Sequence, residues 1–398
     1  MIKDLYKQII ADKGTQKKDT VNNPLSMYLA NREDKDYGFY STGVIPLNLL
    51  FSGRFDRAIP IGKVSMISAD SMMGKSIISL SIVKNAQKDN KDLITIIMDT
   101  ERSFDFEVAE KMGIDTSPEK FIVFQENSLE EVKNIILKTV QLIPREERRN
   151  VLIIFDSWGT LVSSKTIDDG LAGKDVSDMT SSKKKNDLAN ILLNTQCTVF
   201  VINHVYANTG GFGDPLVVPG GKKIVFVSSS VILCTSRAKE KNDDKTVTGH
   251  IITAQTFKSR YSREKTVLQY RIKHDGGLDI FYGLLDDALD GGYVTTGKVL
   301  DEKETKKTGE NVYKEKSGTL MRSHIKNDVA IKEEEIYNSA FWLPIFKDTT
   351  FKKYLEDKYQ FSNSFDINQI EKEIEEINSV EVKEEVTEEI KKQKKVKK

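Results

Sequence analysis

The sequence contains little cysteine, no long apolar run and no excess of either charge. Only Cys197 and Cys234 occur in 398 residues, and both lie in apolar segments. They predict buried, reduced thiols in an intracellular protein rather than a disulfide framework. No stretch approaches the roughly 20 apolar residues of a membrane span. The opening residues, MIKDLYKQII, also lack the apolar core of a signal peptide. A cytoplasmic protein without a membrane partner is expected.

The absence of a net charge excludes fewer classes of protein than the absence of cysteine and of long apolar runs. Lys plus Arg and Asp plus Glu both number 60, so the formal net charge is zero. Nucleic-acid binding remains possible, because the basic surface that it requires is local. Hydrophobic residues make up 38% of the chain and charged residues 30%, which is typical of a globular protein with polar segments.

Composition predicts four regions. Residues 1–40 are polar with two small apolar clusters, and they are expected to form either an arm that docks on a neighbouring subunit or a flexible leader. Residues 41–298 have the composition of a packed core. Residues 299–361 are predicted to be a polar linker followed by a small helical C-terminal region around AFWLPIF. Residues 362–398 carry blocks of Glu and then Lys, which favours a charged helix that fades into a disordered tail.

Short apolar runs alternate with helical patterns in the core. The helical patterns are KSIISLSIVKNAQ and LEEVKNIILKTVQLI. The predicted strands are KVSMIS (63–68), DLITIIMD (92–99), FIVFQ (121–125), NVLIIFD (150–156), CTVFVIN (197–203), SSVILC (229–234) and HIITAQTF (250–257). Near-continuous apolar strands with intervening helices predict an α/β fold with a mostly parallel sheet covered on both faces.

The segment ADSMMGKS follows a predicted strand and opens a predicted helix, which is the context of a phosphate-binding P-loop. Backbone N–H groups in such a turn surround phosphates, Lys75 reaches the β- and γ-phosphates, and Ser76 binds Mg²⁺. ATP with Mg²⁺ is therefore the expected cofactor. The predicted nucleotide contacts are Ala69, Asp70, Ser71, Met72, Met73, Gly74, Lys75 and Ser76.

Two carboxylates end neighbouring predicted strands. Asp156 closes NVLIIFD and is expected to hold Mg²⁺ through water, although many buried strands end in Asp. Glu101 follows the strand DLITIIMD and could align and deprotonate an attacking water. Taken alone, a Glu at a strand end is more often a solvated or capping residue. Together with the P-loop, the two carboxylates favour an ATPase.

In order and spacing, several further segments resemble the RecA-type recombinases, most closely the UvsX branch of tailed phages. The resemblance covers about 41–298 and 341–361. Its segments are IPLNLLFSG, the P-loop, DTE, IIFDSWGTLVS, VSDMT, INH, the PGG turn, FKSR, DGGLDIFYGLLDDAL and AFWLPIF. It implies a RecA-like ATPase core that forms filaments, and host-cell cytoplasm if the source is viral.

The resemblance also assigns roles to single residues. It implies that His204 senses the γ-phosphate, although a lone His at a strand end is as often structural. Lys258 and Arg260 match the pair that reaches a neighbour's ATP across the subunit interface, whereas by themselves they look like solvated strand charges. Asp105 and Tyr282 stand where the family contacts adenine.

Two long segments rich in Gly and Ser, at about 159–182 and 205–221, are expected to hold single-stranded DNA, as they do in the family. Glycines let backbone approach phosphates, and an aromatic ring can stack on bases without reading sequence. Lys183 and Lys184 add charge beside the first loop, or form only a solvated helix face. The predicted DNA contacts are Gly211, Phe212, Gly220, Gly221, Lys222, Lys183 and Lys184.

The resemblance therefore implies a DNA recombinase that forms a helical filament on single-stranded DNA and pairs it with homologous duplex DNA. It implies single-strand-binding and mediator or loader proteins as further partners. Two alternatives stay open: a hexameric helicase built on the same core, and a DNA-binding scaffold that does not hydrolyse ATP.

Overall fold

The computed structural model describes residues 38–361, apart from 175–179, 208–215, 218–220, 281, 297, 301, 311, 316–320, 327–328 and 336–338. The chain separates into one unit from Met1 to Gln360 and a second from Phe361 to Lys398. The predicted arm, except for 38–40, and the predicted tail lie outside the described residues.

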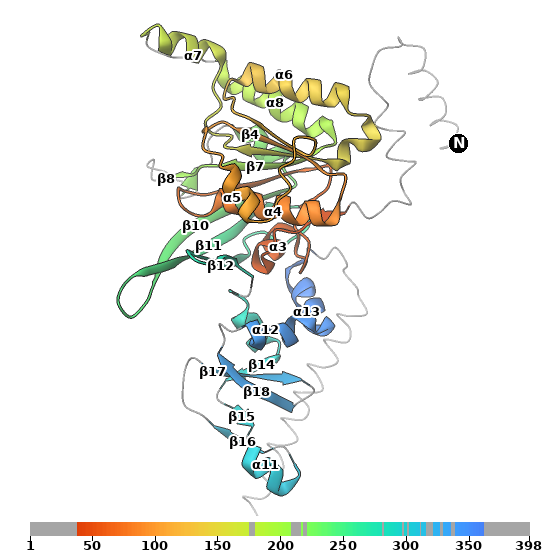
Figure 1. Cartoon of the computed structure of the whole chain (residues 1–398), viewed down its shortest axis with the longest axis vertical. Helices are drawn as coiled ribbons and strands as arrows, with labels where there is room; N and C mark the ends of the chain where they lie inside the picture. Colours follow the sequence, from red (N-terminus) through yellow and green to blue (C-terminus); the bar gives the residue numbers. More distant parts are fainter. Residues whose placement is uncertain are drawn as a thin grey trace, which may run out of the picture. The chain divides into compact units, whose positions relative to one another are not determined.

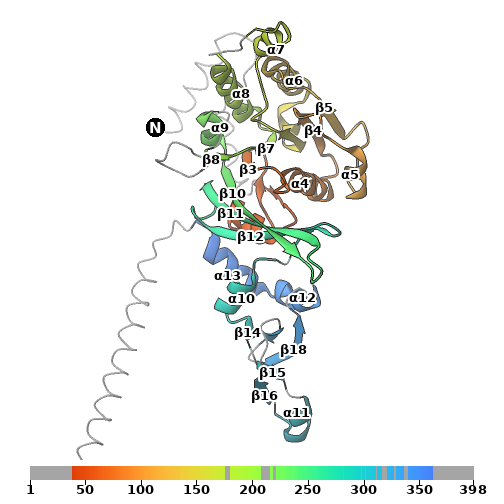
Figure 2. The same ribbon diagram turned by 90° about the vertical axis from the view of Figure 1, so that its left-hand side faces the viewer.

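A nine-stranded sheet forms the centre of the first unit, in the order β13-β12-β11-β10-β3-β7-β6-β4-β5. The strands from β10 to β5 are parallel, and β10, β11, β12 and β13 pair antiparallel. The bounds are β3 Val64–Ser68, β4 Ile94–Asp99, β5 Phe121–Phe124, β6 Val151–Asp156, β7 Thr198–Asn203, β10 Ser230–Lys241, β11 Val247–Ser259, β12 Val267–Lys273 and β13 Gly277–Asp279. Figure 2 shows β10, β11 and β12 side by side below the parallel strands.

Helices cover both faces of this sheet, as Figure 1 shows for α6 and α8 on one side and α3 and α4 on the other. Successive strand residues face opposite layers, so Ile67 packs in one apolar core and Met66 in the other. The helices of this region are α3 Ile45–Ser52, α4 Lys75–Asp89, α5 Phe106–Lys111, α6 Leu129–Leu142, α7 Ser164–Leu171, α8 Ser181–Thr195 and α9 Lys222–Val227, with a 3₁₀ turn, η1, at Arg145–Asn150. The predicted mostly parallel α/β fold is confirmed.

The region after β13 contains strands as well as the predicted helices. Its helices are α10 Leu285–Asp290, α11 Glu302–Thr308, α12 Ser339–Lys347 and α13 Thr349–Tyr359. Its strands are β14 Val294–Thr296, β15 Lys298–Leu300, β16 Tyr313–Glu315, β17 Met321–Lys326 and β18 Val329–Glu335. α12 and α13 lie where the small helical region is predicted, whereas β16, β17 and β18 lie in the predicted polar linker, because MRSHIK and VAIKEEE form strands that composition does not reveal.

Two small pairings complete the described residues. β1 (Phe39–Tyr40) pairs with β2 (Ile59–Pro60) beside the core. β8 (Tyr206–Ala207) pairs with β9 (Leu216–Val217), and both strands lie within the second predicted DNA loop. Cys197 and Cys234 are both buried free thiols, as expected. Among the described residues, no helix has the length and apolar character needed to cross a bilayer.

Candidate nucleotide-binding site

The P-loop connects the end of β3 to the first turn of α4. Gly74 caps α4 with φ of 78°, a left-handed conformation that favours glycine, and a Cβ there would lie 2.1 Å from Cδ1 of Ile272 on β12, so the Ile272 side chain would have to move. Ala69, where the usual first glycine is replaced, is buried and has no left-handed backbone. Its methyl group is therefore compatible with the loop.

The Lys75 ammonium lies over the P-loop itself. Its Nζ donates to the carbonyl oxygens of Ala69 at 3.1 Å and Asp70 at 2.9 Å. The side chain is buried, and this burial lowers the pKa of Lys75, while the charges of Asp156 and Glu101 oppose the shift. The ammonium therefore stands between the loop backbone and the two carboxylates that the sequence predicts to act with it.

Ser76 and Asp156 form the predicted metal pair. The Ser76 hydroxyl donates to Oδ2 of Asp156 at 2.6 Å, and both residues line a cavity of about 290 Å³. Burial, followed by the charge of Glu101, raises the pKa of the Asp156 carboxyl, while the Ser76 hydrogen bond opposes the shift. A hydroxyl and a carboxylate side by side at a cavity fit Mg²⁺, which prefers oxygen ligands and retains several waters.

Glu101 lies between two side chains from neighbouring strand ends. Its Oε1 accepts hydrogen bonds from the Ser157 hydroxyl at 2.7 Å and pairs with Nε2 of His204 at 2.8 Å. Burial alone would raise the pKa of Glu101, but the hydrogen bonds from His204 and Ser157 outweigh it and hold the pKa below its usual value. The structure thus brings the predicted base and the predicted γ-phosphate sensor into direct contact.

The two predicted adenine contacts lie apart. Asp105 lines the same cavity as Ser76, and it also caps α5 by accepting from the backbone N–H of Glu107 at 2.8 Å. Tyr282 lies on the face of β12 that points away from the P-loop, where the Arg271 guanidinium is 4.9 Å from the centroid of the Tyr282 ring. Neighbouring strand residues face opposite ways, and Ile272 is the one that faces Gly74. The structure therefore does not bring Tyr282 to the cavity beside Ser76.

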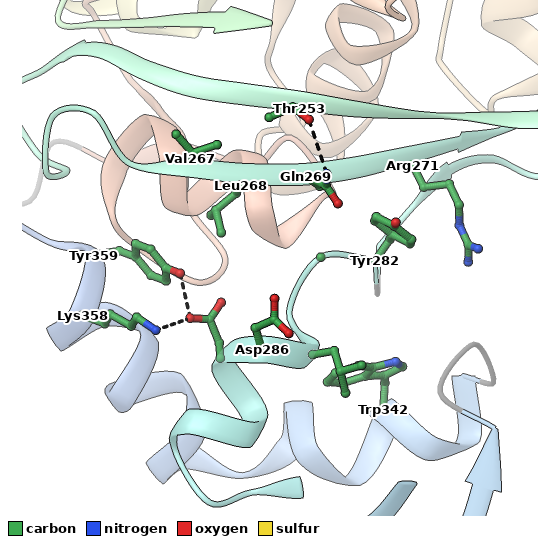
Figure 3. A pocket seen from close by; sticks show the side chains of 13 residues that line it. Thr253, Val267, Leu268, Gln269, Arg271, Tyr282, Asp286, Trp342, Lys358 and Tyr359 are labelled. Atoms are coloured by element: carbon green, nitrogen blue, oxygen red, sulfur yellow. Dashed lines mark hydrogen bonds and ion pairs between the residues drawn. The ribbon is translucent and has the colours of Figure 1, made fainter. Parts of the chain in front are cut away.

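Tyr282 instead lines a second cavity of about 550 Å³, shown in Figure 3. This cavity lies between β11 and β12 on one side and α10, α12 and α13 on the other. Buried Asp287 accepts from the Tyr359 hydroxyl at 2.7 Å and from Lys358 Nζ at 2.7 Å. These bonds join α10 to α13, so they serve the packing of the C-terminal helices against the sheet.

Lys258 and Arg260 lie at the opposite, amino-terminal edge of the parallel strands. The Arg260 N–H donates to Ser229 O, and the Ser229 N–H donates to Val64 O at the start of β3. β11 ends at Ser259, so the strand does not extend through Arg260. The Lys258 ammonium donates to the carbonyl oxygens of Val225, Phe226 and Ser228 at 2.7–2.9 Å, at the end of α9.

The predicted DNA contacts divide into described and undescribed ones. Gly211, Phe212 and Gly220 lie outside the described residues. Gly221 has φ of 93° and precedes Lys222, the exposed first residue of α9. Lys183 is exposed, whereas Lys184 forms an ion pair with Glu130 at 2.9 Å. Among the predicted DNA contacts that the structure describes, Lys183 and Lys222 are thus the lysines that face solvent.

Sequence reasoning missed residues that shape this site. Asp99 is buried and accepts from the N–H groups of Ser103 and Phe104, which folds the loop that carries Glu101. The Tyr270 hydroxyl donates to Met73 O at 2.8 Å and so braces the P-loop from β12. Ser157 directly follows Asp156 in the sequence and could have been suspected. Tyr270 belongs to a strand whose signal is an alternation of apolar and polar residues rather than an apolar run.

A parallel sheet with a P-loop sequence, a hydroxyl–carboxylate pair and a glutamate at its carboxyl edge is typical of P-loop nucleotide-binding proteins of the α/β class. The family model described as RecA N-terminal domain matches residues 15–279. The chain therefore belongs to the RecA family.

Individual relatives agree with this family. The chain is 28% identical over 350 residues to the "Recombination and repair protein" of Enterobacteria phage T4, covering 84% of this chain and 82% of that protein. It is 26% identical over 251 residues to "Protein RecA" of Rhodopirellula baltica, covering 62% and 63% of the two chains. It is 25% identical over 282 residues to "Protein RecA" of Mycobacteroides abscessus, covering 70% and 78%.

Proposed function

We propose that this chain, a DNA recombinase by its family, binds ATP with Mg²⁺, assembles its own copies into a filament on single-stranded DNA and pairs that strand with homologous duplex DNA. The observation that carries the proposal is the position of the predicted residues on the sheet. Lys75, Ser76, Glu101, Asp156 and His204 lie at its carboxyl edge, and Lys258 and Arg260 lie at its amino edge.

At the carboxyl edge, each residue has a separate task. Lys75 and the P-loop N–H groups bind the phosphates, and Ser76 and Asp156 hold the metal. The bound Mg²⁺ supplies charge neutralisation at the phosphates. Glu101 orients water and accepts its proton, and its hydrogen bonds with Ser157 and His204 hold the carboxylate in position for this task.

The position of His204 supports a coupling between ATP hydrolysis and DNA binding. It bonds Glu101 through Nε2 and begins the second predicted DNA loop. A shift of this loop on DNA binding would move the ring that contacts the catalytic carboxylate. DNA binding and nucleotide binding would then favour the same arrangement, and each would strengthen the other.

The separation of the two edges supports an interface site. A strand of five residues such as β3 spans about 16 Å, so Lys258 and Arg260 cannot reach the nucleotide of their own chain. A second copy whose amino edge faces this carboxyl edge would supply them, like an arginine finger in trans. Filament assembly would thus complete the ATPase site.

Further partners follow from a filament on single strands. Proteins that coat single-stranded DNA would compete for the same strand, and a mediator or loader would help the filament to replace them. A DNA substrate also places the protein in the cytoplasm, which is the host cytoplasm if the source is a phage.

Electron microscopy with single-stranded DNA and ATP tests this proposal most directly. Helical filaments are expected, and closed rings in their place would favour the hexameric helicase. ATP hydrolysis measured with and without single-stranded DNA separates the proposal from a scaffold. Stimulation by DNA is expected, and the absence of hydrolysis in both conditions would favour the scaffold.

A further inference from the structure

The first predicted DNA loop, at about 159–182, is anchored at both ends by one carboxylate outside the loop. Glu130, in the first turn of α6, accepts at Oε2 from the Ser164 N–H at 2.9 Å and from the Ser164 hydroxyl at 3.1 Å. Its Oε1 forms an ion pair with Lys184 Nζ at 2.9 Å. Ser164 begins α7, and Lys184 lies in the first turn of α8.

Helix α7 has little else to hold it. None of its eight residues is buried, and Leu171 at its end is 84% exposed. Its base is fixed by the Ser128 and Ser164 hydroxyls at 2.8 Å and by the Leu129 N–H, which donates to Val162 O. Since α7 buries no apolar face, contacts at its base decide whether it is held in place.

The three consecutive lysines beside the loop, 183–185, therefore differ in how readily each ammonium group can bind a DNA phosphate. Lys183 is exposed. The half-buried Lys185 donates to Gly159 O at 3.1 Å. Lys184 is paired, but its side chain and that of Glu130 are still 34% and 38% exposed. An ion pair this exposed is weak, so a nearby phosphate can displace the carboxylate from Lys184.

We propose that Glu130 is a positioning residue that holds the start of α7 in the free protein and withholds Lys184 from DNA. Single-stranded DNA takes over Lys184, and Glu130 then no longer pairs with it. This inference rests on the proposed function, because it takes 159–182 as a DNA-binding loop.

The ionisation state of the Glu130 carboxyl group favours competition between this carboxylate and a DNA phosphate for Lys184. Burial alone would raise the pKa of Glu130, but hydrogen bonds from Lys184 and Ser164 lower it to about 2. The carboxylate is therefore ionised at any pH at which the protein works, and protonation does not open the contact. A phosphate, which carries the same charge, is the kind of group that can replace it.

The variant Glu130→Gln tests the inference in the full chain with oligo(dT) as the probe. It keeps the shape of the side chain and removes the charge that holds Lys184. Affinity for oligo(dT) at low salt is expected to rise about 2–5-fold, the range of an exposed ion pair. Glu131→Gln is the matched control, because Glu131 is an exposed neighbour in the same helical turn. It should give a smaller change.

Repeating Glu130→Gln in a protein that already carries Lys184→Gln tests whether Glu130 acts through Lys184. If Glu130 acts by withholding Lys184, then Glu130→Gln raises affinity in the unaltered protein and leaves it unchanged when Lys184 is already absent. An equal rise in both backgrounds, a rise no larger than that of Glu131→Gln, or a fall in affinity would overturn the inference.

Hydrogen exchange without DNA provides a second measurement. Glu130→Ala removes both hydrogen bonds that Glu130 accepts from Ser164, so amides at the start of α7 are expected to exchange faster than in Glu131→Ala. Equal exchange would show that Glu130 does not hold the loop. If the unaltered protein does not bind oligo(dT), the proposed function fails and this inference with it. Binding that Glu130→Gln leaves unchanged overturns the inference alone.

Discussion

The two edges of the central sheet differ in whether a single chain supplies all the residues of the proposed nucleotide-binding site at that edge. At the carboxyl edge, Lys75 bonds the P-loop, Ser76 bonds Asp156, and Glu101 bonds Ser157 and His204, all within one chain. At the amino edge, Lys258 is bonded to three carbonyl groups of α9, and Arg260 is exposed. In the proposed function, binding of nucleotide thus needs one chain, whereas full hydrolysis needs two. The predictions below test this division.

The largest effect is expected at the carboxyl edge. Lys75→Ala should abolish hydrolysis, because the β- and γ-phosphates lose the cation that neutralises them. Phosphate release in the presence of single-stranded DNA measures this. Lys84→Ala, further along α4, is the control that removes one lysine from the same helix. Turnover of Lys75→Ala at the unaltered rate would show that 69–76 is not the nucleotide loop.

The second prediction concerns the amino edge. Arg260→Ala should lower DNA-stimulated hydrolysis by about 10³-fold or more, because cations supplied in trans to a transferring phosphate are typically worth about 10³–10⁵-fold. Nucleotide affinity of the free chain should stay nearly unchanged. Lys258→Ala is less suited to this test, because it also leaves the carbonyls of Val225, Phe226 and Ser228 without their donor.

Mixing the variants separates a trans role from an ordinary surface charge. In a filament of Arg260→Ala and Lys75→Ala chains, some interfaces pair an intact P-loop with an intact Arg260, and activity should partly return. Lys241→Ala, which removes an exposed lysine elsewhere on β10, should behave as the unaltered protein. If the two variants assemble together on DNA and no activity returns, Arg260 does not act across the interface.

Glu101→Gln should slow hydrolysis by about 10²–10⁴-fold, the usual cost of losing a general base, while ATP binding is retained. The filaments should persist longer, because hydrolysis releases them. Electron microscopy after addition of ATP measures their lifetime. Failure of Glu101→Gln to assemble would mean that Glu101, bonded to Ser157 and His204, has a structural task instead.

The pKa of Glu101 gives this residue a pH test. The carboxylate acts when unprotonated, and its pKa is lowered in the folded chain, so activity should be full above that pKa and fall only as the pH drops through it. The acid limb of kcat should therefore lie below the usual Glu value of about 4.3. An acid limb near pH 6 would assign the titration to another group.

The sequence predicted the parallel half of the sheet well because its strands are short apolar runs with turn residues at their ends. It missed β12, in which Tyr270 and Ile272 alternate with Gln269, Arg271 and Lys273, because a search for near-continuous apolar runs passes over this period-two pattern of a half-buried strand. Yet β12 contributes the Ile272 contact at Gly74 and the Tyr270 bond to Met73. Motifs therefore located the chemical groups, while the strand that braces the P-loop carried only an alternating pattern.

The smallest predicted effect concerns how many lysines bind phosphate. Binding of single-stranded DNA should weaken with salt and depend little on sequence, because the contacts are to phosphates and base faces. Lys183 is exposed beside the first loop, so Lys183→Gln should reduce the slope of log affinity against log salt by about 0.7, the value for one phosphate on a single strand. Lys138→Gln, an exposed lysine on α6, should leave the slope unchanged. If the slope of log affinity against log salt is the same for Lys183→Gln and the unaltered protein, Lys183 belongs to a solvated helix face. Charge beside the first loop would then not contribute to DNA binding until Lys184 is released.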